Sequence, residues 1–192
     1  MAIYKLVWDD FCSWYLEMIK PAYQQPIDEV TYQVTLGFFQ DILKLLHPFM
    51  PFLTEELWHD EAFGERNAND CCIVAQMPEY VQEDTQLLQN IDMVKQLITE
   101  LRNVRNSKQI SPKEALALAV KSISNVNYQP YIAMISKLAN LSAFELTNEK
   151  ITGAVSFIVA TDEIYLLLGQ NIDAAAETER LLKEKELSLI HI

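Results

Sequence analysis

The apolar residues in the first part of the chain recur at the spacing of an α-helix. Residues 3–20 are apolar on most sides, and their polar side chains form a single stripe: Asp9, Ser13, Glu17 and Lys20. Residues 28–46 also place apolar side chains on one face, and Asp28 is suited to cap the start of that helix. These patterns predict two helices, the first of them largely buried.

The same periodicity predicts two further helices. A short helix begins at Pro51 and runs to about residue 60, because proline is favoured in the first turn of a helix. A longer helix covers about residues 84–108, and its apolar face carries Val94, Leu97, Ile98, Leu101 and Val104. Four helices with short links favour an antiparallel bundle.

The period changes after Pro112. Leucine and valine alternate with alanine over residues 115–120, which favours a strand. Ser111 and Glu114 are spaced as a capping box, which favours a helix over the same residues. Beyond them the pattern predicts one more helix and three strands, over residues 128–139, 143–147, 155–160 and 163–168.

The composition is that of a folded globular protein, since 50% of the 192 residues are hydrophobic and only four are glycine. No apolar run approaches the roughly 20 residues needed to span a bilayer. The N-terminus lacks the basic and apolar regions of a leader peptide. We therefore expect a cytoplasmic protein with no membrane partner.

The cysteines indicate neither disulfides nor a metal site. Cys12, Cys71 and Cys72 are too few and too unevenly spaced for a disulfide framework. The chain has no Cys-x-x-Cys pair, and its three histidines lie far apart in the sequence. We expect no bound metal.

The charge is strongly acidic but unevenly placed. The net charge of −12 argues against a general nucleic-acid-binding protein, since contacts to phosphate need Lys and Arg. Residues 1–70 carry 4 basic and 12 acidic side chains, whereas residues 95–121 carry 6 basic and 2 acidic ones. A polyanion would therefore be attracted to the second region and repelled by the first.

Three segments resemble a known protein family. The segment LHPFMPFLTEELW, residues 46–58, contains two prolines that end one helix and start the next. It resembles the signature of the anticodon-binding domain of class I aminoacyl-tRNA synthetases of the valine, isoleucine and leucine group. The flanking segments DDFCSWYLEMIKP and LRNVRNSKQISP, residues 9–21 and 101–112, are most similar to valyl-tRNA synthetases. The resemblance extends over about residues 3–186.

The resemblance favours the strand after Pro112 and implies a C-terminal element. We predict a mainly α fold: an antiparallel helical bundle, as in class Ia anticodon-binding domains, with a small α/β appendage and the start of a C-terminal coiled coil. The bundle covers residues 1–110, the α/β subdomain residues 111–168, and the coiled-coil tRNA-binding arm residues 169–192. Because this arm is a long helical hairpin in the family, we expect a truncated arm here.

The resemblance implies part of an enzyme that lacks the catalytic site. The ATP-binding signatures of class I synthetases, HIGH and KMSKS, do not occur in the chain, and its glycines are isolated. We expect no catalytic residue and no cofactor here, with ATP used elsewhere in a parent valine–tRNA ligase. The expected function is recognition of the tRNA anticodon stem-loop. The expected partners are tRNA, specific for valine, and the catalytic domain of the parent chain, but not DNA.

Basic and amide side chains gather near the end of the helix predicted over residues 84–108. Unpaired bases can stack on guanidinium planes and form hydrogen bonds through their edges. The resemblance places this segment beside the anticodon loop, and the candidate RNA-binding residues are Lys95, Arg102, Asn103, Arg105, Asn106 and Lys108. A solvated face near a helix C-terminus, where cations are favoured, explains the same residues without RNA.

Other functions are compatible with the pattern. An acidic helical bundle is also typical of a protein-interaction module that binds no RNA, and the same domain occurs in leucyl- and isoleucyl-tRNA synthetases. The aromatic residues of the first three helices have a spacing that favours core packing over base stacking: Trp8, Phe11, Trp14, Tyr15 and Trp58. Where the catalytic body is missing, we expect an exposed apolar patch on the first helix.

Overall fold

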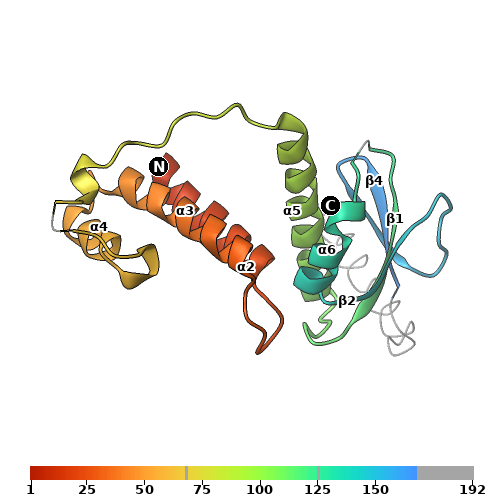
Figure 1. The fold of residues 1–192 in the computed structure, drawn as a ribbon. Coiled ribbons are helices and arrows are strands. Elements are labelled where there is room, and N and C mark those ends of the chain that lie inside the picture. Colours follow the sequence, from red (N-terminus) through yellow and green to blue (C-terminus); the bar gives the residue numbers. More distant parts are fainter. Residues whose placement is uncertain (68, 125, 168–192) are drawn as a thin grey trace, which may run out of the picture. The chain divides into compact units, whose positions relative to one another are not determined.

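A computed structural model describes residues 1–67, 69–124 and 126–167 (Figure 1). The chain forms two compact units, Met1–Gln82 and Glu83–Ile192. The predicted coiled-coil arm, residues 169–192, lies outside the described residues. Within the described ranges, no helix is both long enough and apolar enough to cross a membrane.

The first unit is helical. Its first helical segment comprises α1 (Ala2–Lys5), the π-helical stretch η1 (Leu6–Tyr15) and α2 (Leu16–Ile19). It is followed by α3 (Glu29–Leu46), α4 (Pro51–Trp58) and two short 3-10 turns, η2 (Glu61–Phe63) and η3 (Cys72–Val74). The predicted cap at the start of α3 is confirmed, because the Asp28 carboxylate accepts a hydrogen bond from the Thr31 N–H at 2.9 Å.

The predicted meeting of two helices at residues 46–58 is also confirmed. Pro51 occupies the first turn of α4. At the end of α3, the Nδ1 of His47 is 2.7 Å from the Thr54 hydroxyl oxygen, within hydrogen-bonding distance. The Thr54 hydroxyl donates a hydrogen bond to the Met50 carbonyl at 2.9 Å. Thr54 is 1% exposed, so these bonds join the end of α3 to α4 inside the unit.

A small core holds α3, α4 and the following loop together. Leu43, Trp58 and Cys72 are buried in it. The Trp58 Nε1–H donates to the Asp70 carbonyl at 3.0 Å, and the guanidinium of Arg66 lies 3.7 Å from the centre of the indole ring. The prediction that Trp58 packs in the core is therefore confirmed.

The first helical segment is less buried than we predicted. None of the residues of η1 is buried, and Trp8 is 60% exposed. The side that faces α3 does pack, since Phe11 stacks on Phe39 and the Tyr15 hydroxyl lies 3.1 Å from that of Thr35. Within this unit, the segment has the partner α3 on one side, and that leaves much of its apolar surface exposed.

The second unit combines helices with a four-stranded sheet. The helices are α5 (Thr85–Ser107), the 3-10 turn η4 (Gln129–Tyr131) and α6 (Ile132–Ala139). The strands are β1 (Leu116–Lys121), β2 (Leu141–Leu146), β3 (Val155–Val159) and β4 (Asp162–Leu167). The sheet order is β2-β1-β4-β3, and β1 and β2 run parallel because α6 connects them, whereas the other pairs are antiparallel.

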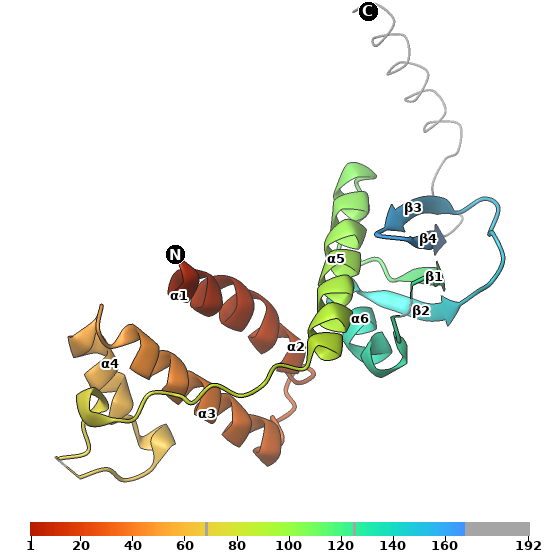
Figure 2. The same ribbon diagram turned by 90° about the horizontal axis from the view of Figure 1, so that it is seen from above.

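Both helices of the second unit lie on one side of the sheet (Figure 2), where α5 contacts α6 and β3. The buried residues of α5 include Val94, Leu97, Ile98 and Leu101. Alternate residues of the central strands, such as Leu118 on β1 and Leu166 on β4, are almost fully buried and lie opposite each other in the register. The strand predicted after Pro112 is therefore confirmed.

The predicted fold class, a mainly α antiparallel bundle with a small α/β appendage, is wrong. The sheet has four strands, and α5 packs with α6 and β3 in the unit that contains this sheet. The chain is therefore a mixed α and β protein. The periodicity of residues 84–108 correctly indicated an apolar helix face, but periodicity carries no information about the surface that covers such a face.

A buried carboxylate joins the sheet to the connection between β1 and α6. Asp162 at the start of β4 is 0% exposed. Its Oδ1 accepts hydrogen bonds from the N–H groups of Ile123 and Ser124, and its Oδ2 accepts from the hydroxyls of Ser124 and Tyr128. Burial by itself raises the pKa of Asp162, but these hydrogen bonds outweigh it and lower the pKa below its ordinary value.

Candidate nucleic-acid interface

The predicted RNA-binding residues lie on the second half of α5 and at its C-terminal cap. The cap is a Schellman motif: the Ile110 N–H donates to the Arg105 carbonyl at 2.9 Å, and the Gln109 N–H donates to the Asn106 carbonyl at 3.2 Å. Gln109 has a φ of 56°, the left-handed conformation that this motif requires. Ile110 is 7% exposed, so the chain after α5 is anchored in the core.

Most of the predicted residues share the exposed side of α5. Arg102, Asn103 and Asn106 are exposed, and Lys95 and Lys108 are half-buried. At 100° per residue, Lys95, Arg102 and Asn106 fall within an arc of about 40°. The structure therefore brings these side chains to one helix face.

Two of these exposed side chains also have partners within the unit. An Arg102 Nη lies 3.4 Å from the Leu138 carbonyl on α6. The Asn103 amide donates to the Glu100 carboxylate, one turn earlier on α5, at 3.3 Å. Both contacts are long and solvent-exposed, so each contributes little by itself.

Arg105 lies at the edge of this arc, about 60° from Arg102 at 100° per residue, and its side chain points into the unit. It is 5% exposed. One Nη donates to the carbonyls of Ser111 and Glu114, and the other donates to the carbonyls of Ala139 and Asn140, at distances between 2.9 and 3.2 Å. Burial lowers the pKa of Arg105, and the charge of Glu114 opposes this effect.

Arg105 therefore joins three segments: the end of α5, the loop before β1 and the end of α6. The carbonyls at the end of α6 carry the negative pole of that helix, which favours a cation there. The sequence contained a signal for this role, because Arg105 follows Leu101, Ile98 and Val94 by four, seven and eleven residues, on the apolar face. The structure thus separates Arg105 from the other predicted RNA-binding residues.

Comparison with known protein families shows to which family the chain belongs. Residues 1–121 match the family model described as the anticodon-binding domain of tRNA ligase. The chain belongs to this family. The matched residues include α5 and its C-terminal cap, so the candidate interface lies inside the region that defines the family.

Curated relatives refine the family membership. The chain is 47% identical to a valine–tRNA ligase of Parabacteroides distasonis over 184 residues, which are 96% of the chain and 20% of the relative. It is 45% identical to that of Bacteroides thetaiotaomicron over 191 residues (97% and 21%) and 31% identical to that of Bartonella quintana over 188 residues (95% and 21%). The chain spans about a fifth of the length of these relatives, and the predicted resemblance to valyl-tRNA synthetases is confirmed.

Proposed function

We propose that this anticodon-binding domain is part of a valine–tRNA ligase and that it holds the anticodon stem-loop of valine tRNA. The observation that carries the proposal is the family match over residues 1–121 together with relatives that are valine–tRNA ligases over nearly the whole chain. Attachment of valine to tRNA, with ATP, would then belong to the remainder of the ligase.

The exposed face of α5 has the chemistry that the proposal needs. Guanidinium and ammonium groups attract phosphates, and amide groups can donate to or accept from the edges of unpaired bases. Arg102, Asn103 and Asn106 offer both kinds of group side by side, with Lys95 and Lys108 at the margins. Three of the six basic residues of 95–121, namely Lys95, Arg102 and Lys108, lie on this part of α5 and its cap, where Glu100 is the acidic residue, which favours this face over the rest of an acidic chain.

Arg105 has a different role in this proposal. Because its guanidinium is engaged by four carbonyls inside the unit, it supports the end of α5 on which the exposed residues lie. We therefore assign base and phosphate contacts to Arg102, Asn103, Asn106, Lys95 and Lys108, and a positioning role to Arg105.

Binding of tRNA transcripts tests the proposal. At fixed low salt, the chain should bind valine tRNA more tightly than the same transcript with a changed anticodon, as measured by fluorescence anisotropy. Lys150→Ala is the control for the loss of one positive charge outside the proposed interface, and it should bind as the unchanged chain does. Lys150 is exposed in the connection between β2 and β3, which extends away from α5 (Figure 1). Equal affinity for both transcripts, or no binding to either, would refute the proposal.

We also propose that the exposed apolar surface of the first unit contacts the remainder of the ligase. Tyr4 is 65%, Trp8 60% and Phe49 70% exposed, and they line a hollow with a volume of about 640 Å³. An exposed apolar surface of this kind is typical of a protein contact. Addition of the separately produced remainder of the ligase should change the fluorescence of Trp8, and a Trp8→Glu variant should lose the association. An unchanged association in this variant would contradict this placement of the contact.

A further inference from the structure

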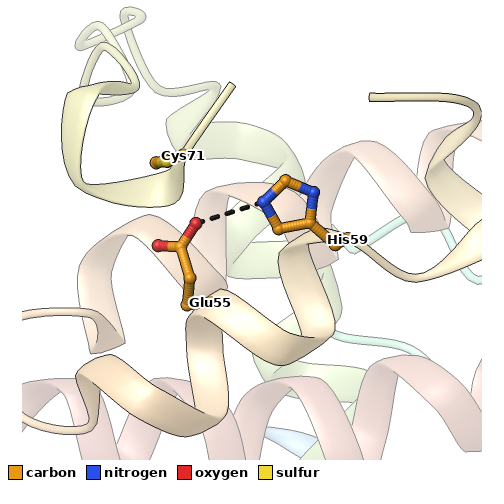
Figure 3. A group of neighbouring side chains, drawn as sticks. All are labelled: Glu55, His59 and Cys71. Carbon is orange, nitrogen blue, oxygen red and sulfur yellow. Dashed lines mark ion pairs between the residues drawn. The ribbon is translucent and has the colours of Figure 1, made fainter. Parts of the chain in front are cut away.

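Three side chains with different ligating atoms converge beside α4 (Figure 3). Glu55 is on α4 and His59 is the C-cap residue of this helix, four residues later, so both side chains lie on the same side of α4. Cys71 reaches them from the loop that returns over α4 after η2. The carboxylate oxygen, the imidazole nitrogen and the sulfur all lie within 4.8 Å of one another, and His59 Nε2 is 3.3 Å from Glu55 Oε1.

The backbone holds this group in place. Both oxygens of the Glu55 carboxylate lie 3.1 Å from the Cys72 N–H, which donates to them. The loop is therefore fixed to Glu55 at the residue next to Cys71. The Cys72 side chain is 3% exposed and belongs to the core with Leu43 and Trp58, so the two neighbouring thiols lie in different environments.

We propose that Glu55, His59 and Cys71 bind one divalent transition-metal ion of the zinc class, with a water molecule as the fourth ligand. In a tetrahedral zinc site with metal–ligand distances of about 2.0–2.3 Å, donor atoms are about 3.4–3.6 Å apart. Glu55 and His59, at 3.3 Å, already have this spacing, and the distances to the Cys71 sulfur, which are at most 4.8 Å, need to contract by no more than about 1.4 Å. Rotation of the Cys71 side chain, which is not fully buried, together with that of the exposed His59 can make this adjustment.

The ligand types select the metal. Sulfur and imidazole nitrogen favour zinc and its neighbours over magnesium and calcium, which prefer oxygen ligands. The thiolate and the carboxylate together neutralise the charge of a divalent ion, and the thiol proton is released to solvent on binding. Our prediction from the sequence that no metal binds relied on short Cys and His spacings, and it did not consider a cysteine that returns to a helix after a loop.

Titration with cobalt tests this site, because Co²⁺ occupies zinc sites and its absorption reports the ligands. The chain should bind one Co²⁺, with a thiolate-to-cobalt charge-transfer band, and Zn²⁺ should displace it. Cys71→Ser should abolish this band, and His59→Gln should weaken binding at least 10-fold, since loss of one ligand of three removes more than about 1.4 kcal/mol. The matched controls, Cys12→Ser and Glu56→Gln, should bind as the unchanged chain does.

Two results would overturn the proposal. One is the absence of the charge-transfer band in the unchanged chain. The other is a band that persists in Cys71→Ser and disappears in Cys72→Ser, which would move the ligand to the other thiol. Circular dichroism of each variant separates loss of a ligand from loss of the fold, and His59→Gln is the safer variant because His59 is on the surface.

Discussion

Replacement of Arg105 by methionine should destabilise the second unit without removing a direct contact to RNA. Methionine keeps the apolar stem and removes the guanidinium, which donates four hydrogen bonds to backbone carbonyls. Hydrogen bonds from a charged group are each worth about 1.5–3 kcal/mol, so their sum is an upper limit of about 6–12 kcal/mol.

Two effects reduce this limit. Three of the four hydrogen bonds are only partly buried, so water can reach these carbonyls in the variant. The folded state also no longer bears the cost of burying a guanidinium. We therefore expect a loss of about 3 kcal/mol in the free energy of unfolding of the second unit.

The assay is urea unfolding with two probes. All three tryptophans, Trp8, Trp14 and Trp58, belong to the first unit, so their fluorescence reports that unit. Amide hydrogen exchange in α5 and β1 reports the second unit. In Arg105→Met the exchange should accelerate in the second unit, while the tryptophan transition should keep its midpoint.

Binding of tRNA provides the second readout for this variant. Under conditions where Arg105→Met is folded, its affinity for valine tRNA should stay within about threefold of the unchanged chain, or about 0.7 kcal/mol. A loss of stability below about 1 kcal/mol, combined with a loss of affinity as large as that of Arg102→Ala, would refute the positioning role.

Four further predictions follow from the structure. Arg102→Ala should weaken binding of valine tRNA by about 1 to 3 kcal/mol if a base edge is read, or reduce the salt dependence by about one unit if only phosphate is contacted; anisotropy titrations at several salt concentrations measure both. Gln109→Gly should stabilise the second unit by about 0.5–1 kcal/mol in urea unfolding, because glycine relieves the left-handed conformation at the cap of α5; a destabilisation would contradict the strain. Asp162→Asn should reduce the loss of stability in acid. The folded-state pKa of Asp162 is lowered, so the ionised carboxylate contributes fully to the free energy of unfolding above the unfolded-state pKa of about 3.9. This contribution disappears as the pH falls through the lower folded-state value. The free energy of unfolding, measured between about pH 3 and 6, should therefore depend less on pH in the variant. Zinc at about 100 times its dissociation constant should stabilise the first unit by about 2.7 kcal/mol. At the same zinc concentration the gain in His59→Gln, followed by tryptophan fluorescence, should fall to about 1.4 kcal/mol or less, because this variant binds at least about 10-fold more weakly.

Local signals in the sequence were sufficient to predict most of the helices and strands. Asp28 and Pro51 start α3 and α4 where we predicted them, because a cap and a proline act on the residues next to them. The alternation of leucine and valine with alanine after Pro112 predicted the strand β1. A helix over the same residues was the alternative, and only the structure excluded it. The segments around residues 46–58 and 101–112 were sufficient to indicate the family that the comparison confirms.

The tertiary structure decided which surfaces these elements cover. It placed α5 with the sheet, left Trp8 exposed, turned Arg105 towards the carbonyls of α6 and brought Cys71 to Glu55. Each of these outcomes depends on residues that are distant in the sequence. Periodicity and capping act within a few residues, and they determine that a helix forms and has an apolar face. The surface that covers this face depends on how the whole chain packs, and so it is decided by the complete fold.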